Sequence, residues 1–399
     1  MPTTVRSWTI QTLAGNGDSG HAGDGGLSRQ ACLNEPKGLA VDAQGHIYIA
    51  DSENHVIRKI DRASGIITTI AGVMDQSAGS ADAQKAVEPA ANDEDPFADV
   101  TQTATQKYTQ QTDLSGTVRY LINGASVQKR FGGDGGPATR AVLNFPTAVA
   151  VDRQGNLFVA DTMNHRVRRV EAATGIITTV AGTGQPRCSG DGGPAAQAAL
   201  NEPAALALDD EGRLFIADQS NNRVRVVDLA SGIIGTYAGT GTASYNGDGI
   251  PAGQANLAGP SGLAVRSGVL YIADTFNGRV RAVDLSTGLI TTAVGNGGEY
   301  RFQAPAELPS PSLSRPSGIA VDAYGNVFVT DSDSHLVRCW DRERHVIRRV
   351  AGTGSASYGG DGGPALEAGL SYPFGIAIDG DGRLYVADTF NHRIREMAL

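Results

Sequence analysis

Hydrophobic and polar positions follow the same order in six successive segments of the chain. The segment that begins at Pro146 shows the pattern: an apolar run (AVAVD), a turn (RQG), a second run (NLFVAD), a turn (TMNH), a third run (RVRRV), a glycine turn and a fourth run (IITTVAG). Short runs rich in Val, Ile and Thr that are bounded by Gly, Asp and Asn are typical of β-strands and the turns between them. Each segment therefore predicts a four-stranded meander.

The segments recur at a nearly constant spacing. They begin at Pro36, Pro146, Pro203, Pro260, Pro316 and Pro373, and the steps between the last five are 57, 57, 56 and 57 residues. A repeat of about 50 residues determines the fold, and four-stranded sheets repeated around an axis form a propeller. The sequence predicts an all-β fold, a six-bladed β-propeller of four-stranded blades, as a single domain over residues 1–399.

The two ends of the chain predict how the ring closes. The last segment stops after three strands, at RIREM, while residues 8–15 (WTIQTLAG) are similar to the missing fourth strand. We expect this N-terminal strand to complete blade six, which would leave no open sheet edge between the first and last blades.

An insertion interrupts the repeat between blades one and two, because the first step is 110 residues long. Its first part, rich in Ala, Gln and Thr, has the composition of a flexible segment. Its second part alternates apolar and polar residues around Asn123 and Gly124, which predicts a hairpin. Loops of this length are either functional or solvated excursions. The insertion, residues 73–130, is thus either a lid that brings Tyr120 to a ligand or a solvated loop.

Composition excludes several classes of protein. A formal charge of −9 and a pI near 5.3 argue against nucleic acid as a partner. No apolar run approaches the roughly 18 residues of a membrane helix, and the first residues do not have the pattern of a secretory signal. We therefore expect a protein of the cytoplasm that does not bind membranes. The three cysteines have unrelated spacings and predict neither disulfides nor a zinc site.

The turn between the second and third strands carries a family signature. The six copies read ADSENHVIRKI, ADTMNHRVRRV, ADQSNNRVRVV, ADTFNGRVRAV, TDSDSHLVRCW and ADTFNHRIREM. They resemble the signature of NHL-repeat β-propellers, and the resemblance covers the whole chain except the insertion. It implies the fold more than an activity, because NHL propellers include peptide-amidating lyases and protein- or RNA-binding modules, and strictosidine-synthase-like enzymes are related propellers.

Polar residues that recur in the blades are interpreted as structural. An Asp precedes an Arg by seven residues in all six copies, as in Asp161 and Arg168, and a catalytic pair is not needed six times. We expect the Asp to cap the turn and the Arg to bond to it or to a neighbouring blade. The motif histidines, such as His55, are expected to pack in turns. The GDGG loops, such as that at Asp134, are expected to shape the crossovers, because one carboxylate does not satisfy calcium.

Positions that differ between blades predict a site at one mouth of the central channel. They flank the first proline of each blade or lie in the turn between strands two and three. The expected catalytic residues are Glu35, Lys37, Glu202 and Arg315, and the expected substrate-binding residues are Phe145, Phe276, Tyr372, Phe374, Phe390, Glu53 and Asp333, together with Tyr120 from the insertion. Apolar walls with a few convergent polar groups are typical of small-molecule sites.

Two functional interpretations follow from this mouth. No P-loop, HExxH pair, CxxC pair or nucleophile elbow is present in the sequence, and we expect neither a cofactor nor a metal. The first interpretation is a site for a small molecule or peptide beneath the insertion, in an acid/base enzyme of the lyase, cyclase or hydrolase type. The alternative is a non-catalytic scaffold that binds a protein partner through the same face.

Overall fold

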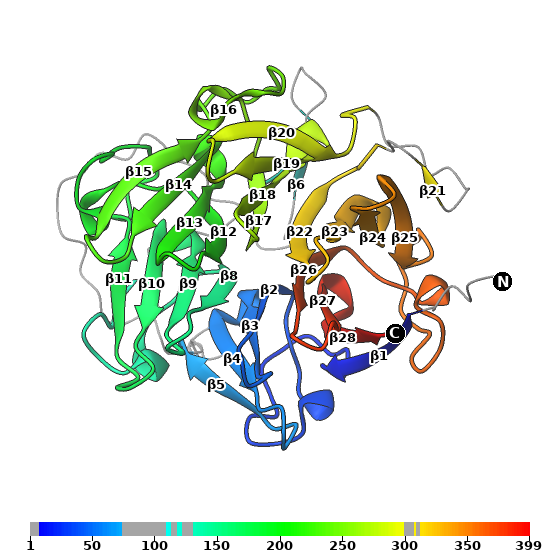
Figure 1. Ribbon diagram of the computed structural model, residues 1–399. Coiled ribbons are helices and arrows are strands. Elements are labelled where there is room, and N and C mark those ends of the chain that lie inside the picture. The colour runs from blue at the N-terminus through cyan, green and yellow to red at the C-terminus, as the bar shows by residue number, and fades with distance from the viewer. Residues whose placement is uncertain (1–7, 74–108, 113–117, 122–130, 299–306, 309–311) are drawn as a thin grey trace. The chain divides into compact units, whose positions relative to one another are not determined.

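The computed structural model describes residues 8–73, 109–112, 118–121, 131–298, 307–308 and 312–399. The chain divides into two units: residues 1–73 with 131–399, and residues 74–130. The first unit carries six sheets, each with a core of four antiparallel strands, arranged around a central axis (Figure 1).

Each sheet is one blade, and its first strand begins at the proline that opens the repeat. Blade one contains β2 (Pro36–Val41), β3 (Ile47–Asp51), β4 (Val56–Ile60) and β5 (Ile67–Ala71). Blade two contains β8 (Pro146–Val151), β9 (Leu157–Asp161), β10 (Arg166–Val170) and β11 (Ile177–Ala181). Blade three contains β12 (Pro203–Leu208), β13 (Arg213–Asp218), β14 (Arg223–Asp228) and β15 (Ile233–Ala238). The predicted starts of these blades are the observed ones.

Blades four and five carry a short additional strand at the outer edge. Blade four contains β17 (Pro260–Arg266), β18 (Val269–Asp274), β19 (Arg279–Asp284) and β20 (Leu289–Val294), with β16 (Ile250–Pro251) beside β20. Blade five contains β22 (Pro316–Val321), β23 (Val327–Asp331), β24 (Leu336–Asp341) and β25 (Val346–Ala351), with β21 (Glu307–Leu308) beside β25. These two-residue strands partly cover edges that the sequence pattern leaves open.

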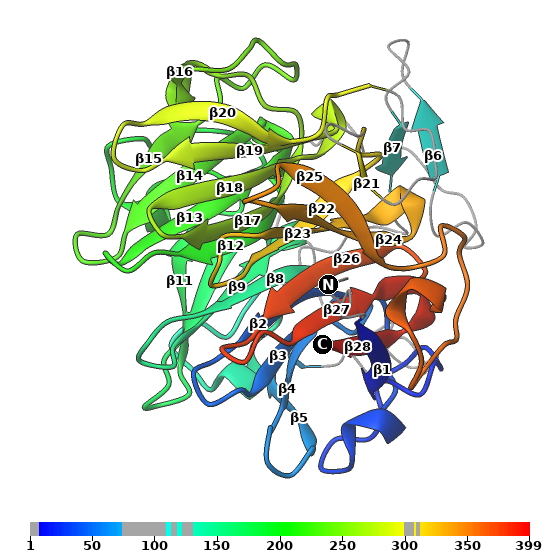
Figure 2. The same ribbon diagram turned by 45° about the vertical axis from the view of Figure 1, so that its right-hand side comes forward.

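The N-terminal strand closes the ring, as predicted. Blade six contains β26 (Pro373–Ile378), β27 (Leu384–Asp388), β28 (Arg393–Ala398) and β1 (Thr9–Ala14), and β1 pairs antiparallel with β28. The turned view in Figure 2 shows β1 beside β28. The two segments are far apart in the sequence, so closure joins both ends of the propeller in one sheet.

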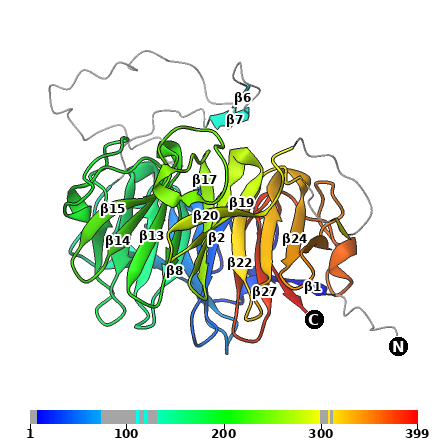
Figure 3. The ribbon, with the colours of Figure 1, turned by 45° about the horizontal axis from the view of Figure 1, so that its top comes forward.

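The innermost strands of neighbouring blades pack backbone against backbone. A methyl group added at Gly262 would overlap the carbonyl oxygen of Ser317, and one added at Gly375 would overlap that of Lys37. Between the blades, alternate strand residues form apolar layers, such as Phe158, Leu206 and Ile216 between blades two and three. The inner strands and the layers between the blades are therefore closely packed. Seen from the side in Figure 3, the turns of the blades lie at two opposite faces of the ring.

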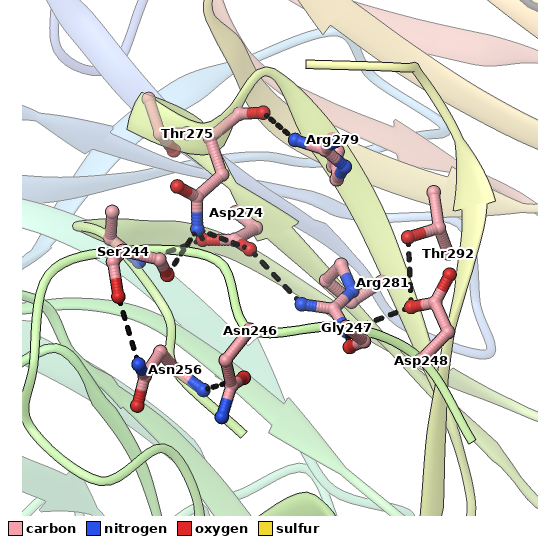
Figure 4. Close-up of polar contacts among 12 residues, drawn as sticks. Ser244, Asn246, Gly247, Asp248, Asn256, Asp274, Thr275, Arg279, Arg281 and Thr292 are labelled. Carbon is pink, nitrogen blue, oxygen red and sulfur yellow. Dashed lines mark hydrogen bonds and ion pairs between the residues drawn. The ribbon is translucent and has the colours of Figure 1, made fainter. Parts of the chain in front are cut away.

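A buried arginine ties each of five blades to the crossover loop that precedes it. In blade four, Arg281 lies 3.4 Å from Asp274 of its own blade and 3.0 Å from Asp248 of the GDGI loop (Figure 4). Asp274 also accepts a hydrogen bond from the amide of Asn277 in the turn. Arg58, Arg168, Arg225 and Arg395 repeat this double ion pair. The expected bond between the repeated Asp and Arg is confirmed, and the Asp of the GDGG loops pairs with the same arginine. The expected capping of the turn is not: Asp274 makes no side-chain cap hydrogen bond to the backbone of the turn and accepts from the Asn277 side chain instead.

The second unit contains a strand pair, β6 (Thr109–Thr112) with β7 (Val118–Leu121), in which Gln110 is opposite Tyr120. The hairpin was predicted around Asn123 and Gly124, which lie outside the described residues. The observed pairing joins Val118–Leu121 to the segment before it, through residues 113–117. The prediction that this insertion places Tyr120 over the mouth stays a prediction.

Candidate functional site: the channel mouth

A strained backbone turn presents the residue before the first proline in most blades. Glu35, Phe145, Glu202 and Tyr372 have φ values between 48° and 54°. Positive φ is uncommon outside glycine and costs free energy, so it persists where the surroundings impose it. Blade four has Gly259 here, with φ 55°.

The motif residue of the preceding blade holds this turn. The backbone N–H of Phe145 donates to Nδ1 of His55 at 2.9 Å, and the N–H of Glu35 donates to Nδ1 of His392 at 3.2 Å. His165 and His335 accept in the same way from Glu202 and Tyr372, and the Asn222 side chain accepts from Gly259. The histidines were expected to pack within turns; they also join one blade to the next and fix the rim of the mouth.

Lys37 lies at the centre of the candidate site. Its Nζ is 5.0 Å from the ring centroid of Phe145 and 4.5 Å from that of Phe374. An ammonium over aromatic faces at these distances is held by cation–π attraction. Lys37 is the second residue of β2, Phe145 precedes β8 and Phe374 lies in β26, so three blades meet around one half-buried amine.

Arg315 brings two further blades to the same place. Its guanidinium carbon is 6.0 Å from the ring centroid of Phe374 and 5.8 Å from that of Phe276. Arg315 Nη1 also lies 3.9 Å from a carboxylate oxygen of Asp333. Phe374 therefore has both cations of the predicted site over its ring.

Burial shifts the pKa values of two ionisable side chains at the mouth in opposite directions. Burial lowers the pKa of Lys37 below its ordinary value; attraction to Glu35 and Glu53 opposes this shift, and repulsion by Arg315 adds to it. Burial raises the pKa of Asp333, against the effect of Arg315. Shifted acids and bases that lie close together are a feature of catalytic sites, although ion-pair networks produce them too.

The structure divides the predicted site residues into groups. Glu35, Lys37, Glu53, Phe145, Arg315 and Phe374 come together, with Phe276 and Asp333 beside Arg315. Tyr372 and Phe390 form a separate aromatic pair, with ring centroids 4.9 Å apart. Glu202 accepts a hydrogen bond from Ser220 in the turn of blade three, so it is grouped with that blade rather than with Lys37.

Comparison of the six blades did not predict the contacts of His335 at the rim of the mouth. Its ring packs edge-on against Tyr372, with centroids 4.5 Å apart, and its pKa is lowered by burial against the effect of Asp333. The motif position was interpreted only as structural, but the neighbouring variable residues give this copy a second set of contacts.

Hydroxyl residues occupy the Lys37 position in three other blades. Thr147 bonds to the hydroxyl of Thr162 at 2.7 Å, and Ser317 accepts from Ser332 at 2.9 Å. Ser261 bonds to Thr275 in the same way. The hydroxyl groups at this position are therefore bonded within their own blades, whereas Lys37 and Phe374 contact each other across two blades.

The described residues contain neither a metal cluster nor a membrane helix. No three His, Cys, Asp or Glu side chains among them gather closely enough to hold a metal ion. No helix in the described ranges is long and apolar enough to cross a membrane. A cavity of about 610 Å³ lies at the other face of blade five, lined by Tyr324, Asn326, Asp341, Arg342, Glu343 and His345.

The fold and the repeated turn define a six-bladed propeller with motif residues that join its blades. The family model for the NHL repeat matches residues 143–170, 313–340 and 370–396, and that for the teneurin NHL domain matches residues 9–90. The chain belongs to the NHL-repeat β-propeller family.

Two curated relatives and one solved structure show the range of this fold. The chain is 30% identical over 271 residues to Protein SUPPRESSOR OF QUENCHING 1, chloroplastic, of Arabidopsis thaliana, covering 65% of this chain and 25% of that protein. It is 28% identical over 315 residues to NHL repeat-containing protein 2 of Gallus gallus, covering 71% and 42%. The chain thus spans less than half the length of these relatives. Virginiamycin B lyase from Staphylococcus aureus superposes with a TM-score of 0.50 at 14% identity, covering 98% and 99%, and shares the fold alone.

Proposed function

We propose that the channel mouth binds a small molecule or peptide and that the protein is an acid/base enzyme of the lyase, cyclase or hydrolase type that works without a cofactor. The observation that carries the proposal is the position of Lys37, whose amine is held between Phe145 and Phe374. An apolar wall around a few polar groups is the general form of a ligand site.

The contacts of the mouth residues give each of them a separate role in the proposal. Lys37, with its lowered pKa, exchanges a proton with the ligand, and Glu35 and Glu53 favour the charged form of the amine. Arg315 holds negative charge on the ligand. The rings of Phe276 and Phe374 pack against its apolar part, together with the pair Tyr372 and Phe390. In this proposal Glu202 contacts the end of the ligand nearest blade three.

The fold is compatible with this chemistry without specifying it. Virginiamycin B lyase shares the architecture, and one architecture supports many activities. The reaction type, the expected absence of a cofactor and a location in the cytoplasm therefore remain parts of the proposal.

The test is a ligand screen on the full chain, followed by turnover assays. A ligand at 100 times its Kd stabilises the folded state by about 2.7 kcal/mol, which a thermal shift detects. Lys37→Ala, Glu35→Ala and Arg315→Ala should lose this stabilisation and turnover, whereas Lys59→Ala should keep both. Lys59 is the matched control, because its Nζ also lies over a ring, 5.5 Å from the centroid of Tyr48. Unchanged turnover in the three mouth variants would show that the site is elsewhere.

Exposed aromatic side chains at the same mouth favour a second candidate, a scaffold that binds a protein. Phe276 is 44% exposed and Phe390 is 39% exposed. Aromatic residues often carry the binding free energy of protein interfaces. This candidate predicts a co-purifying partner that is lost in a Phe276→Ala/Phe390→Ala variant and on deletion of residues 74–128, with no turnover by either form.

A further inference from the structure

The amine of Lys37 is placed differently from that of the other lysine in the described chain. The sequence has five lysines, and Lys85, Lys107 and Lys129 lie outside the described residues. Lys37 Nζ lies over the faces of two rings, those of Phe145 and Phe374. Lys59 lies over one ring, on β4. Lys37 alone combines two rings with nearby carboxylates.

Such an amine is suited to attack a carbonyl group. A lysine becomes a nucleophile when burial or a neighbouring cation favours its neutral form. Both conditions hold here, because Lys37 is half-buried between phenyl rings and Arg315 lies over the same Phe374 ring. Burial, and secondarily Arg315, lower the pKa of Lys37, so a larger fraction of the amine is neutral at a given pH.

The neighbouring charges indicate what kind of carbonyl compound would fit. Arg315 and Lys37 share Phe374, so a carboxylate on Arg315 leaves the rest of a short ligand close to the amine. Guanidinium groups bind carboxylates through paired hydrogen bonds. Glu35 and Glu53, which attract the ammonium form of Lys37, are the groups available to move protons.

We propose that Lys37 forms a Schiff base with an oxo acid, meaning an aldehyde or ketone that carries a carboxylate. This inference rests on the proposed function, since it uses the same mouth. The neutral lysine nitrogen forms a bond to the carbonyl carbon as the carbon–oxygen double bond becomes a single bond, and a proton lost from the nitrogen passes to the oxygen to give a carbinolamine. A second proton from a neighbouring carboxyl group lets this oxygen leave as water. The nitrogen remains doubly bonded to carbon as a protonated imine, and no electrons are gained or lost overall.

The experiment traps the imine on the full chain. The protein is incubated at neutral pH with glyoxylate and sodium cyanoborohydride, whose hydride reduces the imine to a stable secondary amine, and the adduct is located by peptide mass spectrometry. We expect Lys37 to be modified at least ten times faster than Lys59. Lys37→Arg should remove the fast adduct, and Lys59→Arg should keep it. The comparison of the two lysines within the wild-type chain does not depend on the folding of any variant.

Arg315 is tested by changing the reagent. Arg315→Gln should slow the modification of Lys37 by glyoxylate about tenfold, in line with the loss of one charged hydrogen bond. It should slow modification by acetaldehyde, which has no carboxylate, less than modification by glyoxylate, because only the pKa of Lys37 changes with that reagent. Equal slowing with both reagents would overturn the assignment of Arg315 to the carboxylate.

Failure of the imine and failure of the binding site give different results. Equal modification of Lys37 and Lys59 overturns the Schiff base. The ligand found by the thermal-shift screen then decides the site separately: if it protects Lys37 from acetylation, binding at the mouth stands without imine chemistry. If it leaves Lys37 acetylation unchanged, the proposed function is wrong as well.

Discussion

The arginine ion pairs that tie strands to crossover loops recur from blade to blade, whereas the residues of the channel mouth do not. The ties repeat: five blades place an arginine between an Asp of their own sheet and an Asp of the preceding crossover. The mouth does not repeat: the position of Lys37 holds Thr147 in blade two and Phe374 in blade six. Residues that recur in the blades stabilise the fold, and positions that the fold does not constrain can be used for binding or catalysis.

The largest expected effect comes from breaking a tie. Arg281→Ala would leave the buried Asp274 without its ion pair, at a cost of about 3–5 kcal/mol in the free energy of unfolding. The same change in blade five, Arg338→Ala, should cost less. Arg338 donates to the carbonyl of Ser312 at 2.9 Å, and its side chain is 11% exposed, whereas that of Arg281 is fully buried. Urea denaturation of both variants measures the difference. Equal losses would show that the difference in burial between the two arginines does not determine the cost.

Removing the amine of Lys37 should lower turnover and leave stability unchanged, the opposite of what the arginine variants should do. Lys37→Met keeps the length of the side chain and removes the charge, so turnover should fall by about 10²–10⁴-fold if Lys37 is the acid/base group. Its midpoint of urea unfolding should stay close to that of the wild type. Lys59→Met is the control, with turnover unchanged. A variant that loses stability but keeps turnover would place Lys37 among the structural residues.

Hydrogen bonds between a motif residue and the first turn of the next blade join neighbouring blades. One of them holds the backbone of Glu35, a catalytic candidate. His392→Ala would leave the N–H of Glu35 without its acceptor, at a cost of about 1–3 kcal/mol. His392→Asn should recover part of this, because Asn222 already performs the same task for Gly259. Thermal unfolding of the two variants gives the comparison. If His392→Asn is no better than His392→Ala, the hydrogen bond is not what stabilises the turn.

The repeat made the fold predictable, because each of six copies predicts the same four strands. Blade starts, ring closure and the structural role of pairs such as Asp161 and Arg168 follow from residues that the copies share. The contacts within the mouth were harder to predict, because variability between the blades indicates an exposed surface but not which side chains meet there. It grouped Glu202 with Lys37, whereas the structure gives Glu202 a partner in Ser220. The distances that place Lys37 between two rings depend on blades that are distant in sequence, and no local pattern contains them.

The smallest expected effect is the dependence of stability on pH at Lys37. Burial lowers the pKa of this amine in the folded protein, so between the folded and unfolded pKa values the unfolded chain binds more protons. The free energy of unfolding should therefore rise with pH across that window, by about 1.4 kcal/mol for each unit of difference between the two pKa values. Urea unfolding at several alkaline pH values, compared with Lys37→Met, isolates this contribution, because the variant has no proton to lose at this position. If stability at the mouth fell instead as the pH rose, the two phenyl rings and the nearby carboxylates would stabilise the ammonium more than burial opposes it. Lys37 would then be a charged anchor for an anionic ligand and not a nucleophile.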